Sequence, residues 1–242
     1  MSNKLTLAYQ TELKRTRLMT GSRVQETWNR LGSYNEEDVP RFIAKVEPIV
    51  RAGQQRASAT TSAYLSRKLN VSAVAVPLDD VVARVRNGAP FAEVYRRPFV
   101  EVWGDLHDNQ SWSDAVQSGG KRAWSLSTMD ILLSFTAAMM VFSAVRGAGE
   151  RVVGYQRVSD PACCEYCAML DGVVTGPDEP MPIHNNCGCT ADPLLRETAA
   201  ERDSPSVQPG DTVQDAAIEE HGEYGPVITV AGQHFTGPSD LN

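Results

Sequence analysis

The stretch that decides the fold is Trp124–Val145, WSLSTMDILLSFTAAMMVFSAV. Its most apolar part, Met129–Val145, is 17 residues long. Four polar residues interrupt this part: Asp130, Ser134, Thr136 and Ser143. A membrane-spanning helix needs about 20 predominantly apolar residues. We therefore expect a core helix that is buried inside the protein, and no membrane-spanning segment.

The residues before this stretch have the apolar period of two long helices. Apolar side chains recur every three or four residues over 5–31 and again over 42–69, as in helices that bury one face. Gly32 separates the two runs, and Asn35 and Pro40 are typical of a helix start. We expect a helical hairpin. Three of its apolar residues are candidate anchors on a partner protein or, alternatively, core residues: Trp28, Phe42 and Val46.

Two further helical segments are expected between the hairpin and the apolar stretch. Residues 91–106 have helical periodicity, and the sequence from Ser111 to Asp114 matches a capping pattern before another helix. We expect Gly119-Gly120 to interrupt that helix. The sequence thus predicts a helical body over residues 1–146, made of a long helical hairpin and further helices.

After residue 147 the sequence changes in character. Arg151–Val158, Val173–Thr175 and Cys187–Ala191 are expected to form short strands. We place a small Cys/His module at residues 147–200. Pro, Gly and acidic residues are frequent in 201–242, which we interpret as an extended acidic tail. The predicted fold class is α+β, with a mainly helical N-terminal body, a small Cys-rich α+β module and an extended acidic C-terminal tail.

The formal net charge of -7 is distributed unevenly over the 242 residues. Residues 1–75 hold 12 Lys and Arg against 6 Asp and Glu, whereas residues 201–242 hold 1 against 8. The overall acidity argues against non-specific nucleic-acid binding by the whole surface, but the basic front could contact phosphate locally. The first residues have no apolar run of signal-peptide length, so a cytosol-like compartment is expected.

All five cysteines lie between residues 163 and 189, close to a histidine. Thiolate and imidazole groups are the ligands that structural zinc sites use. The spacing C-x2-C, sixteen residues, then H-x2-C-x-C is within the range of such sites. The sequence therefore predicts a structural zinc site with five candidate ligands: Cys164, Cys167, His184, Cys187 and Cys189. Cys163 is the cysteine left over.

The local structure around these ligands can also be predicted. Asp160 is a good N-cap and Gly172 a good end for a short helix. Cys164 and Cys167, three residues apart on that helix, would face the same side. The last two cysteines are two residues apart, so on a strand they would share one face.

Other roles for the same residues stay open at this point. The cysteines could be reduced and packed without a metal, or two of them could form a disulfide. Cys187 and His184 could be a catalytic thiol–imidazole pair, although nothing nearby looks like an orienting third group. An HNH-type nuclease would need a further histidine downstream, and none occurs between Cys189 and His221.

The cysteine pattern resembles a known family. The run Cys164-x-x-Cys167-x-x-Leu170-x-Gly172, followed by Pro182-x-His184-x-x-Cys187-x-Cys189-Thr190, resembles the phage Mu protein F-like minor head proteins. The family usually has an arginine between the last two cysteines, where this chain has Gly188. The residues around His221 and Gly232 look like versions from tailed phages of actinobacteria.

The resemblance implies a structural minor capsid protein of the virion, located inside the head near the portal. Such a protein acts in head assembly or in genome packaging and delivery. The implied partners are the portal protein, the major capsid or scaffold protein, further copies of the chain and, through the basic N-terminal region, packaged DNA. We expect no membrane partner, and host cytoplasm as the location during assembly. The alternative is a capsid maturation protease, a label that some relatives carry, but no protease motif is found.

Overall fold

The computed structural model describes residues 4–196, 212–213, 216–223, 225–230 and 233–234. The helical elements are α1 Lys4–Asn29, α2 Asp38–Leu69, α3 Leu78–Val82, η1 Val85–Gly88, α4 Phe91–His107, α5 Trp112–Ser143, η2 Gly149–Arg151 and α6 Glu165–Met169. The strands are β1 Val152–Val158, β2 Val174–Thr175, β3 Thr190–Leu195, β4 Thr212–Val213, β5 Ala216–His221, β6 Gly225–Val230 and β7 Gln233–His234. This arrangement confirms the predicted α+β class with a helical body.

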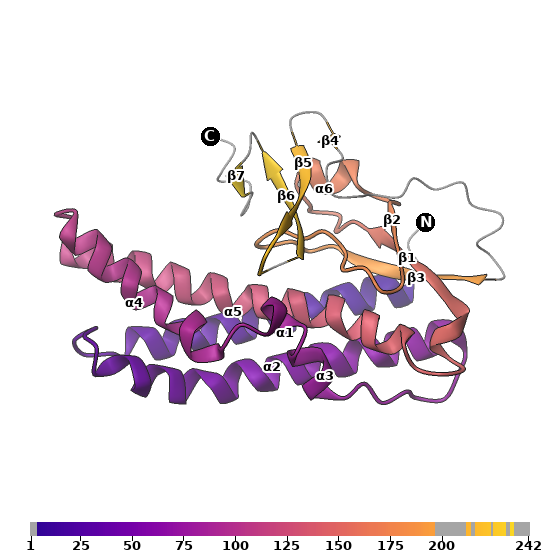
Figure 1. Ribbon diagram of the computed structural model, residues 1–242, viewed down its shortest axis with the longest axis horizontal. Helices are drawn as coiled ribbons and strands as arrows, with labels where there is room; N and C mark the ends of the chain where they lie inside the picture. The colour runs from indigo at the N-terminus through magenta and orange to yellow at the C-terminus, as the bar shows by residue number, and fades with distance from the viewer. Residues whose placement is uncertain (1–3, 197–211, 214–215, 224, 231–232, 235–242) are drawn as a thin grey trace.

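The long helices α1, α2, α4 and α5 lie side by side along the longest axis, and the sheets lie on one side of them (Figure 1). Helix α5 packs against the other three long helices. Of its apolar 18-residue window, which is long and apolar enough to cross a membrane by length and composition, 89% is buried inside the protein. The prediction of a buried core helix is therefore confirmed.

Helices α1 and α2 form the expected hairpin, with the predicted local signals at their ends. The Asn35 side-chain oxygen accepts the backbone N–H groups of Glu37 and Asp38, at 3.0 and 3.2 Å, where α2 begins. At the start of α5, the Ser111 hydroxyl accepts the Asp114 backbone N–H at 3.1 Å. These bonds satisfy donors that a helix start otherwise leaves unpaired.

The three candidate anchors on the hairpin are core residues. Trp28, Phe42 and Val46 are all fully buried in one cluster that joins α1, α2, α4 and the first half of α5. Trp28 contacts Phe42 and Phe99 edge to face, with ring centroids 5.4 and 4.9 Å apart. The anchor interpretation is wrong for these residues, because their apolar surface is already covered by the protein's own helices.

The expected interruption at Gly119-Gly120 is also wrong. Helix α5 runs without a break from Trp112 to Ser143. A Cβ atom on Gly119 would lie 2.6 Å from Trp28 and from Val102. The two glycines therefore permit close packing of α5 against α1 and α4, and the packing outweighs their low helix propensity.

The first sheet has the antiparallel order β2-β1-β3 and is held against the helices through Asp192 of β3. The Asp192 carboxylate accepts hydrogen bonds from Thr6 of α1 at 3.1 Å and from Tyr64 of α2. It also pairs with Lys68 of α2 at 2.9 Å. Three side chains of the hairpin thus fix the strand that follows the last cysteine.

Two local predictions in the cysteine module need correction. Asp160 does not begin the short helix: its carboxylate accepts the Ala162 backbone N–H at 2.8 Å in a turn, and α6 begins only at Glu165. The last strand begins at Thr190, so Cys187 and Cys189 precede β3 and are not on it. In both places a turn replaces regular structure: the Cys187 and Cys189 side chains enter the core, whereas Pro161 and Ala162 stay exposed and the Asp160 carboxylate is used within its turn.

The described part of 201–242 is a second antiparallel sheet of order β4-β5-β6-β7, and not an extended, unpaired tail. Ile218 of β5 is buried against Tyr166 and Leu170 beside α6. Glu223, in the turn after β5, pairs with Arg86 and, at 2.6 Å, with Arg97 of the helical body. An apolar contact and an ion-pair cluster therefore hold this sheet to the rest of the protein.

Candidate metal centre

The five candidate ligands come from two segments that the fold brings together. Cys164 is the N-cap residue of α6 and Cys167 lies inside that helix. His184, Cys187 and Cys189 lie in the loop between β2 and β3. Cys164 is partly exposed, and the other four residues are at most 3% exposed.

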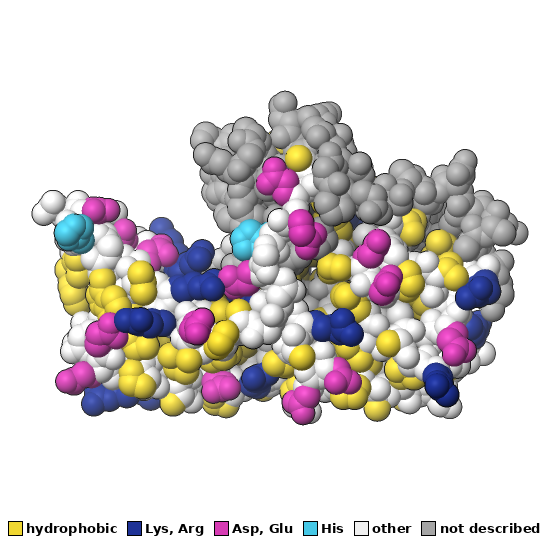
Figure 2. Space-filling view, in the orientation of Figure 1, with side chains coloured by type: hydrophobic (Ala, Val, Ile, Leu, Met, Phe, Trp, Pro, Cys, Tyr) yellow, Lys and Arg dark blue, Asp and Glu magenta, His cyan; other side chains and the backbone are white. Residues whose placement is uncertain are grey.

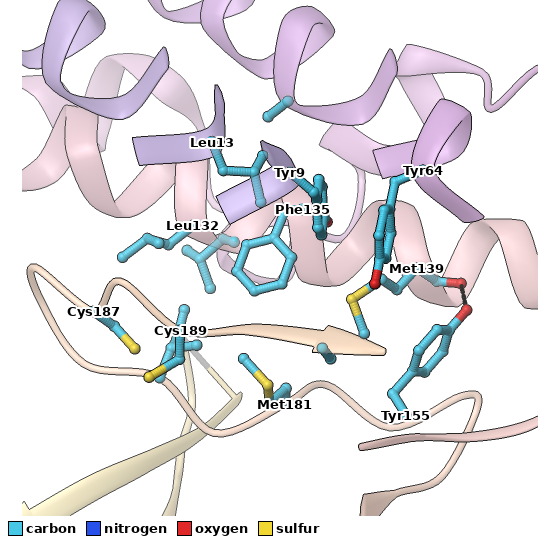
Figure 3. Close-up of a cluster of buried hydrophobic side chains, with 14 of the residues drawn as sticks. Tyr9, Leu13, Tyr64, Leu132, Phe135, Met139, Tyr155, Met181, Cys187 and Cys189 are labelled. Atoms are coloured by element: carbon cyan, nitrogen blue, oxygen red, sulfur yellow. Dashed lines mark hydrogen bonds between the residues drawn. The ribbon is translucent and has the colours of Figure 1, made fainter. Parts of the chain in front are cut away.

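The loop also contributes to the hydrophobic core. Figure 3 shows Cys187 and Cys189 on the loop that runs beneath α1 and α5, near Leu13 and Leu132. The same cluster of buried side chains includes Cys167 and Phe135. The thiols therefore lie on the inner face of the module, against the helical body.

The ligand atoms form two overlapping trios. Cys164, Cys167 and His184 make one, and Cys167, Cys187 and Cys189 make the other, each with its ligand atoms within 4.8 Å of one another. Cys167 belongs to both. Cys163 belongs to neither, as predicted for the cysteine left over. All five cysteines are free thiols in the structure.

The tautomer of His184 follows from its partners. Its Nδ1 lies 2.5 Å from the Asn185 carbonyl oxygen, which can only accept a hydrogen bond. Nδ1 therefore carries a proton, and Nε2 is the ring atom in position to bind a metal. Nε2 lies 3.5 Å from the Cys164 sulfur and 2.9 Å from the Cys167 sulfur. A backbone partner of this kind is the usual way to orient a metal-binding imidazole.

Two of the three ligand distances fit the edges of a tetrahedral zinc site, and the third, 2.9 Å from the Cys167 sulfur to His184 Nε2, is shorter than such an edge. Zinc bonds of about 2.3 Å to sulfur and about 2.0 Å to nitrogen place two sulfur ligands about 3.8 Å apart, and a sulfur and a nitrogen about 3.5 Å apart. The Cys167 and Cys187 sulfurs are 3.8 Å apart, and the Cys164 sulfur is 3.5 Å from the imidazole nitrogen. The cluster could therefore hold a metal ion, with more candidate ligands than the four that tetrahedral coordination uses.

Two buried arginines flank the cluster, and sequence reasoning missed both. Arg157 of β1 donates to the sulfurs of Cys167 and Cys187, at 3.1 and 3.4 Å. Arg17 of α1 donates to the Cys187 carbonyl oxygen. Burial acts to lower the pKa of Arg157, but the adjacent thiolates, that of Cys187 foremost, raise it above its ordinary value. No sequence motif marks these residues: Arg17 is 170 positions from Cys187, and Arg157, although ten positions from Cys167, lies in an ordinary strand pattern.

Neighbouring groups shift the pKa values of the thiols. Hydrogen bonds with the Cys167 and Cys189 thiols hold the pKa of Cys187 well below its ordinary value, and the Arg157 guanidinium acts in the same direction. Burial acts to raise the pKa of Cys164, but the hydrogen bond with His184 outweighs it and lowers that pKa. The thiolate is thus favoured at Cys187 and Cys164, whereas hydrogen bonds with the Cys187 and Cys189 thiols raise the pKa of Cys167.

Gly188 occupies a position that only a glycine fits without movement of its neighbours. A Cβ atom there would meet the carboxylate oxygen of Asp160, with the Asp160 Cβ at 2.9 Å. Asp160 is held in place by its turn and by Lys14 at 3.4 Å. The departure from the arginine usual in the Mu protein F-like family therefore has a steric reason in this chain.

Comparison with known proteins does not identify the chain. No protein-family model matches the sequence, and neither the curated proteins nor the solved structures gave a significant match.

The catalytic alternative receives no support from the position of the imidazole. His184 Nε2 faces Cys164 and Cys167, whereas its hydrogen bond with Cys187 joins backbone atoms, from the Cys187 N–H to the His184 carbonyl at 3.1 Å. Of the other histidines, His107 is exposed at the end of α4, and His221 accepts the Glu223 backbone N–H at 3.1 Å. Neither belongs to the cluster.

Proposed function

We propose that the protein is a structural minor head protein of a tailed phage, in which a zinc ion held by the Cys/His cluster fixes the small module to a long helical body. One observation carries this proposal. The residues on which the family resemblance depends, far apart in the sequence, form one buried cluster of metal-ligand type.

The donor set favours zinc as the ion. Thiolates and an imidazole in a closed, tetrahedral arrangement are typical of structural zinc sites. His184 with Cys164 and Cys167 would supply three ligands, and Cys187 or Cys189 the fourth. When bound, the ion would supply the bond energy that fixes α6 to the loop before β3, where only short elements are available.

The helical body offers a surface for a partner in the head. Leu7 and Leu18 of α1 are 41% and 42% exposed, and Met19 is 46% exposed. Leu7 and Leu18 are eleven residues apart, about three helical turns, so they lie on the same face. Arg15 lies between them and is exposed. We propose that this face, in place of the buried Trp28, docks on the portal or on a neighbouring head protein.

The decisive experiment is to locate the chain in particles. We expect mass spectrometry of purified virions, from the phage that encodes the chain, to detect it in DNA-filled heads at low copy number. A double L18E/M19E variant, supplied in place of the natural chain, should be incorporated less. The exposed V100E change on α4 serves as a control, since it also places negative charge at an exposed apolar residue, on another helix. Absence of the chain from purified heads would refute the proposal.

A second measurement tests the zinc independently of the phage. We expect one zinc ion per purified chain and thiols that react only after denaturation and chelation. If the folded protein contained no metal and all its thiols reacted, a structural zinc ion in the Cys/His cluster would be excluded. Cleavage of the chain or of the scaffold protein on co-expression would instead favour the maturation protease.

A further inference from the structure

Arg157 is a buried cation without a carboxylate partner. Its side chain is on β1, and the residue is 3% exposed. Besides the two cysteine sulfurs, it donates to the Pro182 carbonyl at 2.5 Å. Among the residues that the structure describes, no Asp or Glu forms an ion pair with it. The Nε atom, buried as well, has no hydrogen-bond partner there.

A buried guanidinium of this kind is costly unless negative charge lies beside it. The groups that can supply the charge are the thiols around it, of which Cys167 and Cys187 are in hydrogen-bond contact. N–H groups that point at sulfur stabilise a thiolate more than a neutral thiol, because the hydrogen bond is then charge-assisted. The position of Arg157, with its N–H groups on two sulfurs and no carboxylate in contact among the described residues, therefore suits sulfurs that a metal ion holds as thiolates.

The charge of the proposed centre matches this requirement. A divalent ion with three thiolates and one neutral imidazole has a net charge of −1. The Arg157 guanidinium beside it offsets that charge, while the second buried arginine, Arg17, bonds to the Cys187 backbone and has Asp160 as a nearby opposite charge. The orientation of His184 suits this centre, because Nδ1 lies against the Asn185 carbonyl and Nε2 faces the Cys164 and Cys167 sulfurs.

We propose that Arg157 is the positioning residue of the metal centre: it is the counter-cation of the metal–thiolate cluster and holds the sulfurs of Cys167 and Cys187 in place as ligands. This inference rests on the metal centre proposed above. Arg17 assists from α1, where its guanidinium holds the backbone of the same loop at the Cys187 carbonyl.

The test compares metal binding by full-length variants at one fixed pH. R157Q removes the charge, R157K keeps it without the fork of donors, and R151Q is the matched control. Arg151 directly precedes the same strand and donates to the Leu69 carbonyl at 3.0 Å, so R151Q removes an arginine-to-backbone bond outside the cluster. Zinc affinity is measured by competition with a chromophoric chelator. Cobalt is then bound in place of zinc, and its sulfur-to-metal charge-transfer band reports the thiolate ligands.

We expect R157Q to lower zinc affinity about 10–100-fold, as loss of a group that orients metal ligands does, and to weaken the cobalt band. R157K should recover part of both signals, and R151Q should match the natural chain. If R157Q does not fold, R157M, which fills the same space without charge, carries the same expectation. Natural affinity and an unchanged cobalt band in R157Q or R157M would overturn the inference. Failure of the natural chain to bind any metal would instead refute the metal centre itself.

Discussion

Gly119 gives the sharpest test of how α5 packs in the helical body. We consider the change G119A, which adds one methyl group to a buried helix. That methyl carbon would lie 2.6 Å from Trp28 and from Val102, and 2.7 Å from the backbone oxygen of Pro98. None of these contacts is with the free end of a flexible side chain. Gly104 of α4 is the matched control, because nothing lies within 4 Å of a methyl group added there.

The two changes are expected to affect the free energy of unfolding differently. Replacing glycine by alanine inside a helix stabilises it by about 1 kcal/mol. G104A should therefore raise the free energy of unfolding by about 1 kcal/mol, and Tm by about 2–4 °C for a chain of this size. In G119A the same gain is opposed by overpacking, which costs about 1–3 kcal/mol. The two variants should thus differ in stability by about 1–3 kcal/mol, with G119A the less stable.

The assay is urea unfolding of both variants and the natural chain under identical metal conditions, followed by far-UV circular dichroism. Equal denaturant slopes would show that the comparison concerns stability and not a change in the unfolded state. If G119A stabilised the protein as much as G104A, then α5 would not approach α1 and α4 as closely as described, and the explanation for its unbroken helix would be wrong.

Three further outcomes are expected. D130A should destabilise the protein by about 3 kcal/mol in urea unfolding, because it removes a carboxylate that is 2.5 Å from the buried Arg86, a cation that also pairs with Glu223. Partial burial acts to raise the pKa of Glu223, but hydrogen bonds from Arg97 and Arg86 lower it below 4.5. The contact of the second sheet should therefore be complete at neutral pH and be lost as the pH falls through that lowered pKa. Hydrogen exchange of the backbone amides of β5 measures the loss of this contact. In the E223Q variant these amides should already exchange faster than in the natural chain at neutral pH. Chelation of the proposed zinc should lower Tm, with recovery when zinc is added back; a Tm that chelators leave unchanged would contradict a structural ion.

Much of the helical body can be predicted because its signals are local. The start of α5 follows from Ser111 and Asp114, three residues apart, and the burial of its second half follows from one apolar stretch. That the helix continues through Gly119 could not be predicted in this way. The packing partner that favours glycine there is Trp28, far away in the sequence, and its position depends on the completed fold.

The same distinction applies to the candidate metal centre. Its ligands have a spacing that reveals the type of site, so the cluster could be predicted without a structure. The arginines have no such spacing: the hydrogen bond from Arg17 to Cys187 joins residues 170 positions apart. The turn at Asp160 also differs from the predicted helix start, because the capping oxygen is used within the turn itself.

The position of the metal-ligand cluster determines which parts of the protein the loss of a bound ion would destabilise. Cys167, Cys187 and Cys189 share one continuous group of buried side chains with Phe135 and Met139 of α5 (Figure 3). Basic and acidic side chains are interspersed over the face of the helical body that Figure 2 shows. Inside, apolar contacts join the helices to the module, together with the polar contacts of Asp192. Movement of the loop would expose part of the shared cluster and would remove the acceptor of Arg17 on α1. We therefore expect the module and the helices to unfold in one transition, and the ion to stabilise both.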